Sequence, residues 1–282
     1  MTTAQRRTVV REYCGAAGSE RRACRWLGVP RATLRYASVR RAQPRLLAHL
    51  RELALRWPRW GSARLTWRMR QDGWCVNHKR IERVLRLEHL LVRQRPRKKR
   101  PAGARVPVPA PVRANERWSM DFVRDVLADG RPFRVWTLVD DATRECPFLL
   151  VARSLPAARV IEALEYLRRE RGTPCAIVCD NGPEFASREM DQWASAHAVR
   201  LAFIEPGRPV QNAFVESFNG KLRDECLNVH HFLSLADAQR KIEAWRVLYN
   251  TARPHQGLKN RTPEQMATLL QNSQHVPAPQ TL

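Results

Sequence analysis

Three acidic residues of this 282-residue chain occupy positions where a charge needs a partner. Asp121 lies inside an apolar stretch, and Asp180 directly follows the apolar run 175–179. Glu216 lies early in a helical pattern that follows a turn rich in proline and glycine. Because burying an isolated charge is unfavourable, acids in such places indicate a compensating cation or a structural ion pair.

Divalent metal ions are cations that three carboxylates could hold together. Mg²⁺ prefers oxygen ligands and keeps positions open for water and phosphate. Two such ions about 4 Å apart can activate a hydroxyl or a water and stabilise the leaving oxygen of an in-line phosphodiester displacement. We therefore expect Asp121, Asp180 and Glu216, named here the acidic triad, to bind two Mg²⁺ ions, for which Mn²⁺ can substitute. Since the chain has 27 acidic residues, spacing alone is weak evidence, and ordinary structural roles are the alternative.

The part of the chain that carries the acidic triad alternates between strand and helix patterns. Short apolar runs and turn signals, among them Asp129-Gly130, predict five strands, over 118–126, 133–139, 148–152, 175–179 and 201–204. Helical periodicity predicts three helices, over 160–169, 190–198 and 213–227. This order predicts an α/β domain with a ribonuclease-H-like five-stranded mixed sheet and helices on both faces. Open α/β sheets bind ligands at the carboxyl ends of their strands, which is where we expect Asp180.

The helix that carries Glu216 is expected to direct this side chain away from the core. Asn212 is the expected N-cap, so Glu216 falls in or just beyond the first turn, where the helix dipole favours an ionised carboxylate. At 100° per residue, the spacing predicts a buried stripe of Phe214, Phe218 and Leu222. Glu216 then projects to the opposite side and faces a cleft.

The charge of the chain is strongly uneven. Residues 1–113 hold 29 basic and 6 acidic side chains, whereas residues 114–282 hold 21 of each. Such segregation favours a polyanion as partner, and we expect double-stranded DNA; an anionic membrane or a merely solvated surface is the alternative. The apolar fraction of 44% excludes a wholly disordered chain. Since no apolar run approaches about 20 residues and no leader is evident, we expect a cytoplasmic, nucleoid-associated protein without a membrane span.

Short helices dominate the basic half, which is expected to form an all-α arm of helix-turn-helix type. Helices over 19–27 and 31–38, joined by a turn at Gly28, are typical of such a reader, although an ordinary helical pair looks the same. The predicted organisation is a helix-turn-helix-like segment (1–42), a helical DNA-contacting module (43–93), a basic proline-rich linker (94–113), a catalytic core (114–230) and a C-terminal helix and tail (231–282).

Basic side chains of the module and the linker are the expected DNA contacts. The last helix of the module begins after Asn77, an expected N-cap, and basic residues crowd its polar side. The linker contains five prolines, seven basic residues and no acid, a composition that favours an extended strap. The residues expected to contact DNA are Arg64, Asn77, Lys79, Arg80, Arg83, Lys98, Lys99 and Arg100.

Several other polar residues are expected to be structural. Asp140 and Asp141 fit a strand-end turn in which Arg144 pairs with one of them. His255 fits a capping or packing residue. The seven cysteines are scattered, so neither a disulfide framework nor a zinc site is expected.

Several motifs around these acids resemble a known family. WSMDF (118–122), VDDATRE (139–145), VCDNGPEF (178–185) and QNAFVESFNGKLRDECL (211–227) are similar to the integrase core of bacterial insertion-sequence transposases. Thirty-five residues lie between Asp180 and Glu216, the spacing of the DDE class that includes retroviral integrases. YNTARPHQGL (249–258) and TPEQM (262–266) resemble that family's tail, and residues 56–86 its accessory helical module. The resemblance is to the second-frame product (OrfB) of the insertion-sequence-three group.

This resemblance implies a DNA transposase that cleaves and transfers insertion-sequence ends. It implies the acidic triad as the catalytic, metal-binding residues. Arg223 takes the place of the basic residue that contacts the transposon end, and Lys221 is a second candidate. The implied partners are transposon-end and target DNA, further copies of the chain, and the first-frame product (OrfA), fused or associated.

Two other functions fit parts of the same sequence. A metal-dependent nuclease would use the acidic triad with water as the nucleophile. An inactive DNA-binding regulator, a relic of a dead element, would need only the basic half. Joining of DNA ends separates a transposase from a nuclease, and any magnesium-dependent chemistry excludes the relic.

Overall fold

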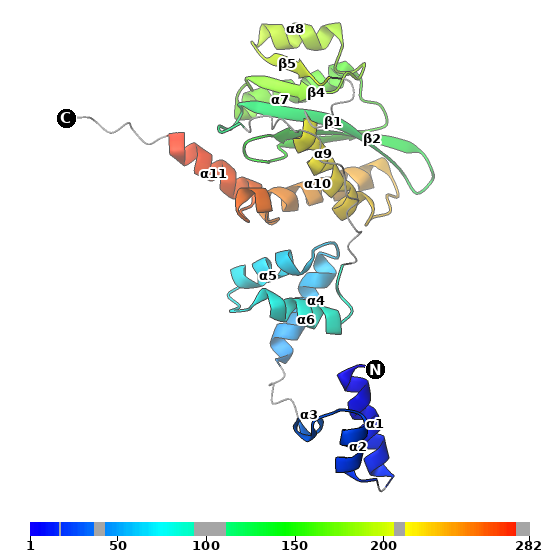
Figure 1. Ribbon diagram of the computed structural model, residues 1–282. Coiled ribbons are helices and arrows are strands. Elements are labelled where there is room, and N and C mark those ends of the chain that lie inside the picture. The colour runs from blue at the N-terminus through cyan, green and yellow to red at the C-terminus, as the bar shows by residue number, and fades with distance from the viewer. Residues whose placement is uncertain (17, 37–42, 93–110, 206–211, 275–282) are drawn as a thin grey trace, which may run out of the picture. The chain divides into compact units, whose positions relative to one another are not determined.

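A computed structural model describes residues 1–16, 18–36, 43–92, 111–205 and 212–274 (Figure 1). The chain divides into two compact units, Met1–His49 and Leu50–Leu282. Most of the predicted linker, with Lys98, Lys99 and Arg100, lies outside the described residues.

The first unit is helical. It contains α1 (Thr3–Gly15), α2 (Glu20–Trp26) and α3 (Arg31–Arg35). Gly28, in the turn between α2 and α3, has a φ of +59°, a left-handed conformation that glycine adopts without strain. The helices share a small core of Val10, Ala23, Cys24, Val29 and Leu34.

Two of these helices correspond to sequence expectations. The expected helix 19–27 is α2, and the expected helix 31–38 is α3, which ends at Arg35; residues 37 and 38 lie outside the described ones. The sequence pattern does not predict α1, because Val10 is its one buried residue and amphipathic periodicity is therefore weak.

Residues 50–92 of the second unit are named here the helical module. It contains the end of α4 (Pro44–Arg56), followed by α5 (Ser62–Gln71) and α6 (His78–Leu87). Asn77 caps α6 as expected, since its Oδ1 accepts a hydrogen bond from the Lys79 amide at 3.0 Å. The side chains that are almost wholly buried in this module are Leu50, Leu65, Met69, Ile81 and Leu85.

The rest of the second unit is built on one mixed sheet in the order β3-β2-β1-β4-β5. β1 pairs antiparallel with β2, and β2 with β3, whereas β4 is parallel to both β1 and β5. The five expected strands all form, and the expected turn at Asp129-Gly130 joins the first two. The strands are β1 (Arg117–Val126), β2 (Pro132–Asp140), β3 (Phe148–Ala152), β4 (Ala176–Cys179) and β5 (Arg200–Phe203). The predicted ribonuclease-H-like arrangement is thus confirmed.

Helices cover both faces of this sheet, as expected (Figure 1). Val123 of β1 packs in one core with α9 (Ala213–Leu222) and α10 (Leu235–Thr251). Met120 packs in the opposite core with α7 (Ala157–Arg171) and α8 (Arg188–Ala196). Because side chains alternate along a strand, Asp121 projects to the same face as Val123, toward α9.

The expected helix 213–227 does not form as one α-helix. After α9 the chain makes a π-helical turn, η2 (Arg223–Leu227), in which the Asn228 amide donates to the Arg223 carbonyl at 2.9 Å. A 3-10 turn, η3 (Gln256–Leu258), and α11 (Pro263–Gln274) follow α10. Every described helix is too short or too polar to cross a membrane.

Candidate active site

Strand register brings the first two acids of the triad to one level of the sheet. The parallel pairing of β1 and β4 places Ser119 opposite Val178. Asp121 and Asp180 each lie two residues further along, one within β1 and one just past the end of β4. Since neighbouring strands are about 4.8 Å apart, the two acids are neighbours on adjacent strands.

Asp121 is held by two hydrogen bonds and carries an unfavourable charge. Its Oδ1 accepts from the Phe122 amide and its Oδ2 from the Asn219 side-chain amide, both at 2.7 Å. Burial, together with the nearby charges of Asp180 and Glu216, raises the pKa of Asp121 to about 6, although the two hydrogen bonds act to lower it. The three acids therefore share one electrostatic environment.

The loop after β4 holds Asp180 in place. Its Oδ1 accepts a hydrogen bond from the Gly182 amide at 3.0 Å. A Cβ at Gly182 would lie 3.0 Å from that same oxygen, so the close approach favours glycine. Further along the loop, Glu184 forms an ion pair with Arg134 of β2, and Phe185 is fully buried.

α9 carries Glu216 on its exposed side. The helix is tied to β1 at two points: Asn219 donates to Asp121, and Asn212 donates to the Met120 carbonyl at 3.3 Å. Asn212 occupies the N-cap position but makes no side-chain capping hydrogen bond, so its expected capping role is wrong. Its amide is instead used to fasten the helix to the sheet.

The expected buried stripe of α9 is also partly wrong. The buried residues are Val215, Phe218 and Leu222, whereas Phe214 is half-buried. The Phe214 ring has the Arg144 guanidinium 3.6 Å from its centroid, a cation–π contact that compensates for its incomplete burial.

The pairing expected for Asp140 and Asp141 also differs. Arg117, and not Arg144, donates to Asp141, with 2.6 Å between Nε and Oδ2. Asp140 accepts hydrogen bonds from backbone amides of its own turn, those of Ala142 and Thr143. Both acids are structural, as expected. His255 is buried with its ring edge-to-face on a tyrosine, which confirms the expected packing role.

A metal ion shared by the acidic triad requires further closure of the site. Among the described residues, no three His, Cys, Asp or Glu side chains are arranged to hold one ion. The donor chemistry nevertheless fits Mg²⁺, because all three side chains are carboxylates and the ionised form of Asp121 is disfavoured by burial and by the charges around it. Asp121, Asp180 and Glu216 would therefore have to approach one another to share an ion.

The two basic residues expected to contact DNA near α9 lie in different environments. Arg223 is exposed, and its Nη2 donates to the Arg124 carbonyl of β1 at 3.1 Å. Lys221 donates to the Ser217 hydroxyl at 2.7 Å, and burial, with neighbouring arginines, lowers the pKa of its amine to about 8. Arg223 is the more accessible of the two.

The expected DNA contacts of the helical module also divide into two groups. Lys79 and Arg83 are exposed on α6, and Arg80 is half-buried there. Arg64, on α5, instead donates to Glu225 of η2, with 2.9 Å between Nη1 and Oε1. Asn77 uses its side-chain oxygen in the cap of α6.

Sequence reasoning missed three residues that shape this site. Asn219 lies one helical turn beyond Glu216, a spacing that could have identified it, because residues three apart share a helix face. Arg134 and Glu225 have no such local signal, since their partners are distant in sequence.

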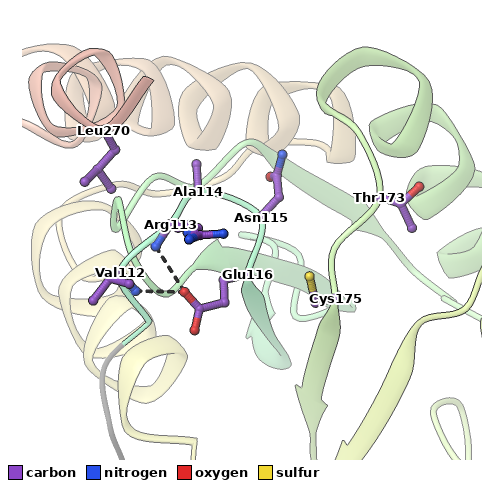
Figure 2. Close-up of a pocket in the computed structure, with 8 residues that line it drawn as sticks. All are labelled: Val112, Arg113, Ala114, Asn115, Glu116, Thr173, Cys175 and Leu270. Carbon is purple, nitrogen blue, oxygen red and sulfur yellow. Dashed lines mark hydrogen bonds between the residues drawn. The ribbon is translucent and has the colours of Figure 1, made fainter. Parts of the chain in front are cut away.

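A pocket of about 960 Å³ lies at the opposite end of the sheet (Figure 2). Asn115 and Cys175, which precede β1 and β4, belong to its lining, as does Leu270 of α11. Glu116 accepts hydrogen bonds there from the amides of Val112 and Arg113. The pocket is therefore separate from the acidic triad, which lies at the carboxyl end of β4.

Comparison with known protein families gives matches over the regions that contain the acidic triad and the helical module. Two sequence profiles described as "Integrase core domain" match residues 111–209 and 197–263. A third, described as "HTH-like domain", matches residues 41–99, which include the helical module.

Proteins of insertion elements resemble the chain over most of its length. The "Insertion element IS407 uncharacterized 31.7 kDa protein" of Burkholderia multivorans is 43% identical over 92% of this chain and 94% of that protein. The "Insertion element IS476 uncharacterized 39.2 kDa protein" of Xanthomonas euvesicatoria is 45% identical over 88% of this chain and 72% of that protein. Among solved structures, a chain of the simian T-cell lymphotropic virus intasome in complex with PP2A regulatory subunit B56 gamma shares the fold. Its TM-score is 0.51 at 18% identity, covering 84% of this chain and 77% of that one.

Proposed function

This chain belongs to the insertion-element transposases of the insertion-sequence-three group, and we propose that it acts through a DDE active site formed by the acidic triad. Its activity is polynucleotidyl transfer: cleavage of element ends and their joining to target DNA by in-line displacement at phosphorus. The observation that carries the site assignment is the register of β1 and β4, which makes Asp121 and Asp180 neighbours, together with the hydrogen bond by which Asn219 ties the helix of Glu216 to Asp121. Burial and the charges of Asp180 and Glu216 raise the pKa of Asp121, which suits a site that receives cations.

We propose that Asp121, Asp180 and Glu216 hold two Mg²⁺ ions, with Mn²⁺ as a substitute. When bound, the ions would activate the attacking hydroxyl or water and stabilise the leaving oxygen. Asp121 is ionised above about pH 6, and its hydrogen bonds to Phe122 and Asn219 fix its orientation. The Gly182 amide orients Asp180 in the same way.

DNA binding is assigned to the basic half and to the edge of the core. The HTH-like profile covers the module that exposes Lys79 and Arg83, and Arg223 lies near the acidic triad on the continuation of α9. We assign further contacts to Lys221, Arg80 and the linker residues Lys98, Lys99 and Arg100. We also propose that the active form contains several copies of this chain, with the first-frame product fused or associated.

The experiment is a strand-transfer assay with the purified full chain. It supplies labelled DNA carrying the terminal repeats of its own element, a supercoiled target and Mg²⁺. The Asp180→Asn variant is expected to lose strand transfer and to retain DNA in a gel-shift assay. Asp191→Asn, an exposed acid on α8, is the matched control and should transfer normally.

The outcomes separate the alternatives. Strand transfer by Asp180→Asn would overturn the site assignment. Cutting without joining by the wild-type chain would identify a nuclease that uses water. DNA retention without any magnesium-dependent chemistry would identify a DNA-binding relic.

A further inference from the structure

A buried carboxylate of η2 joins the helical module to the catalytic core. The Glu225 side chain is only 7% exposed and binds two arginines from distant parts of the chain. Arg64 of α5 donates to its Oε1 at 2.9 Å. Arg253, just beyond α10, donates to both oxygens, from Nε at 2.8 Å and from Nη2 at 2.6 Å. The cluster thus connects α5, η2 and the end of α10.

The energetics of this cluster depend on Glu225. Arg253 is itself 4% exposed, so its charge has little access to water. Lys221 lies close enough to Arg253 and Arg64 for both to lower its pKa, while Glu225 raises it. One carboxylate therefore offsets several crowded cations. Removing one partner of a buried ion pair leaves the charges of the others uncompensated. Loss of Glu225 should therefore destabilise the packing of the arginines around it.

A second contact strengthens the same connection. Asp224, next to Glu225, forms an ion pair with Arg59, which precedes α5. This pair is largely exposed, with 41% and 45% of the two side chains accessible, so it should contribute less than the buried one. The two adjacent acids of the π-helical turn thus both face the helical module.

The same helical segment carries a member of the acidic triad. η2 continues α9 without a break, and Glu216 and Asn219 lie upstream on that helix. We expect a displacement of η2 to shift the residues beside Asp121, because η2 and α9 form one continuous helical segment. π-Helical turns are frequent at functional sites, which fits this position.

We propose that the Arg64–Glu225–Arg253 cluster is the joint through which the helical module docks on the core and holds the helix of Glu216 in its working position. Glu225 is then a positioning residue, and Arg64 is a docking residue as well as an expected DNA contact. The part of this inference that concerns catalysis rests on the proposed function. The docking itself does not.

A distance measurement tests docking independently of activity. Cys75 of the helical module and Cys175 of the core are both exposed, so they can carry spin labels in the full chain. Cys14, which is half-buried, is replaced by serine to avoid a third label. Double electron–electron resonance should give one narrow distance distribution for this parent protein. Arg64→Gln and Glu225→Gln should broaden it.

The matched control is Arg68→Gln, which removes an arginine of the same helix that pairs within the module, with Asp72. Its distribution should equal that of the parent. Far-ultraviolet circular dichroism at the measurement temperature verifies that each variant is folded. If Glu225→Gln does not fold, Arg64→Gln alone still tests the docking. Equal, narrow distributions in the parent and in the folded docking variants would overturn the proposal, as would a broad distribution in the parent.

Activity then tests the positioning role. Arg64→Gln and Glu225→Gln should slow strand transfer by about tenfold or more, as small misplacements of reacting groups do. The affinity of Glu225→Gln for target DNA should stay within about twofold of the parent, because this substitution removes no basic residue. Arg64→Lys should restore part of the rate. Unchanged transfer in a variant with a broadened distance distribution would refute the positioning role, whereas an inactive parent would contradict the proposed function and leave the docking result valid.

Discussion

The two halves of the chain use positive charge in opposite ways. Residues 114–282 hold as many acids as bases, and several of their arginines form ion pairs within the fold, as in the pairs Arg117–Asp141 and Arg134–Glu184. Residues 1–113 hold 29 bases and only 6 acids, so most of their cations have no acid of that half to pair with. Lys79 and Arg83 illustrate this, since both are exposed on α6.

Under the proposed function, this difference indicates that the chemistry and most of the affinity for DNA reside in different parts of the chain. In the core, many charged groups form ion pairs within the fold, and one of these pairs, Arg134–Glu184, holds the loop that follows Asp180. The basic half leaves its charged groups accessible to phosphates, whose neutralisation releases counterions. Substitution of exposed cations in the basic half should therefore lower DNA affinity, and substitution of the acidic triad should lower strand transfer; Arg64 is the exception, because it docks the helical module on the core.

The largest effect is expected from Glu216→Gln. Loss of a metal-binding carboxylate should reduce strand transfer by about a thousandfold or more, because the stabilisation of the leaving oxygen is lost. DNA retention measured by gel shift should remain within about twofold of wild type. A parallel loss of DNA retention would contradict the division of roles between the two halves, since it would make the core a principal source of affinity for DNA.

Asp121→Asn should stabilise the metal-free protein while it reduces strand transfer, as Glu216→Gln does. The folded protein holds the Asp121 proton up to about pH 6, above the ordinary pKa of 3.8, so ionisation there opposes folding. The free energy of unfolding of wild type, relative to the variant, should fall as pH rises from about 4 to about 6 and stay level above. The difference should reach at most about 3 kcal/mol at pH 7.5.

Urea unfolding in a chelating buffer across this pH range checks the prediction. Equal stability of the two proteins at every pH would contradict the assigned environment of Asp121. Asp191→Asn is the control, because that acid is exposed.

Gly182→Ala should have a smaller effect on the same site. The added Cβ would meet Asp180 Oδ1 at 3.0 Å, so the carboxylate or the loop must shift by a few tenths of an ångström. We expect strand transfer to fall about tenfold, with a loss of stability of about 1 kcal/mol. Gly130→Ala affects a distant turn at positive φ and serves as the control for stability without loss of activity. Full activity of Gly182→Ala would show that Asp180 does not depend on this contact.

Lys79→Gln should give the smallest change. Removing one phosphate contact lowers DNA affinity a few-fold, and the slope of log affinity against log salt should decrease by about 1. Arg159→Gln, which removes an exposed cation of α7 in the core, should leave that slope unchanged. Fluorescence anisotropy over a salt series measures both. Equal slopes for wild type and Lys79→Gln would exclude Lys79 as a phosphate contact.

Sequence reasoning succeeded where the signal was local. Alternation and the Asp129-Gly130 turn located the β1–β2 hairpin, and the hydrophobic face of α6 with Asn77 located that helix. The orientation of α9 was harder to predict, because Phe214 and Val215 are both apolar, and it is the packing of Val215 into the core that leaves Phe214 half-buried beside Arg144.

Pairings between segments that are distant in the sequence could not be predicted from the sequence. The register that aligns Ser119 with Val178 joins segments about 60 residues apart, and nothing in either segment specifies it. Arg64 was expected to contact DNA because it lies in a basic helix, yet it pairs with Glu225, 161 positions away. Assignment of a charged residue to solvent or to an ion pair thus depends on distant parts of the chain.

Binding of Mn²⁺ to the full chain tests the central claim most directly. Electron paramagnetic resonance at pH 7.5 counts the ions bound by wild type, by the combined Asp121→Asn, Asp180→Asn, Glu216→Gln variant and by the Asp191→Asn control. We expect wild type and the control to bind Mn²⁺ equally and the combined variant to lose that binding. Undiminished Mn²⁺ binding by the folded combined variant would show that these three carboxylates are not the metal site.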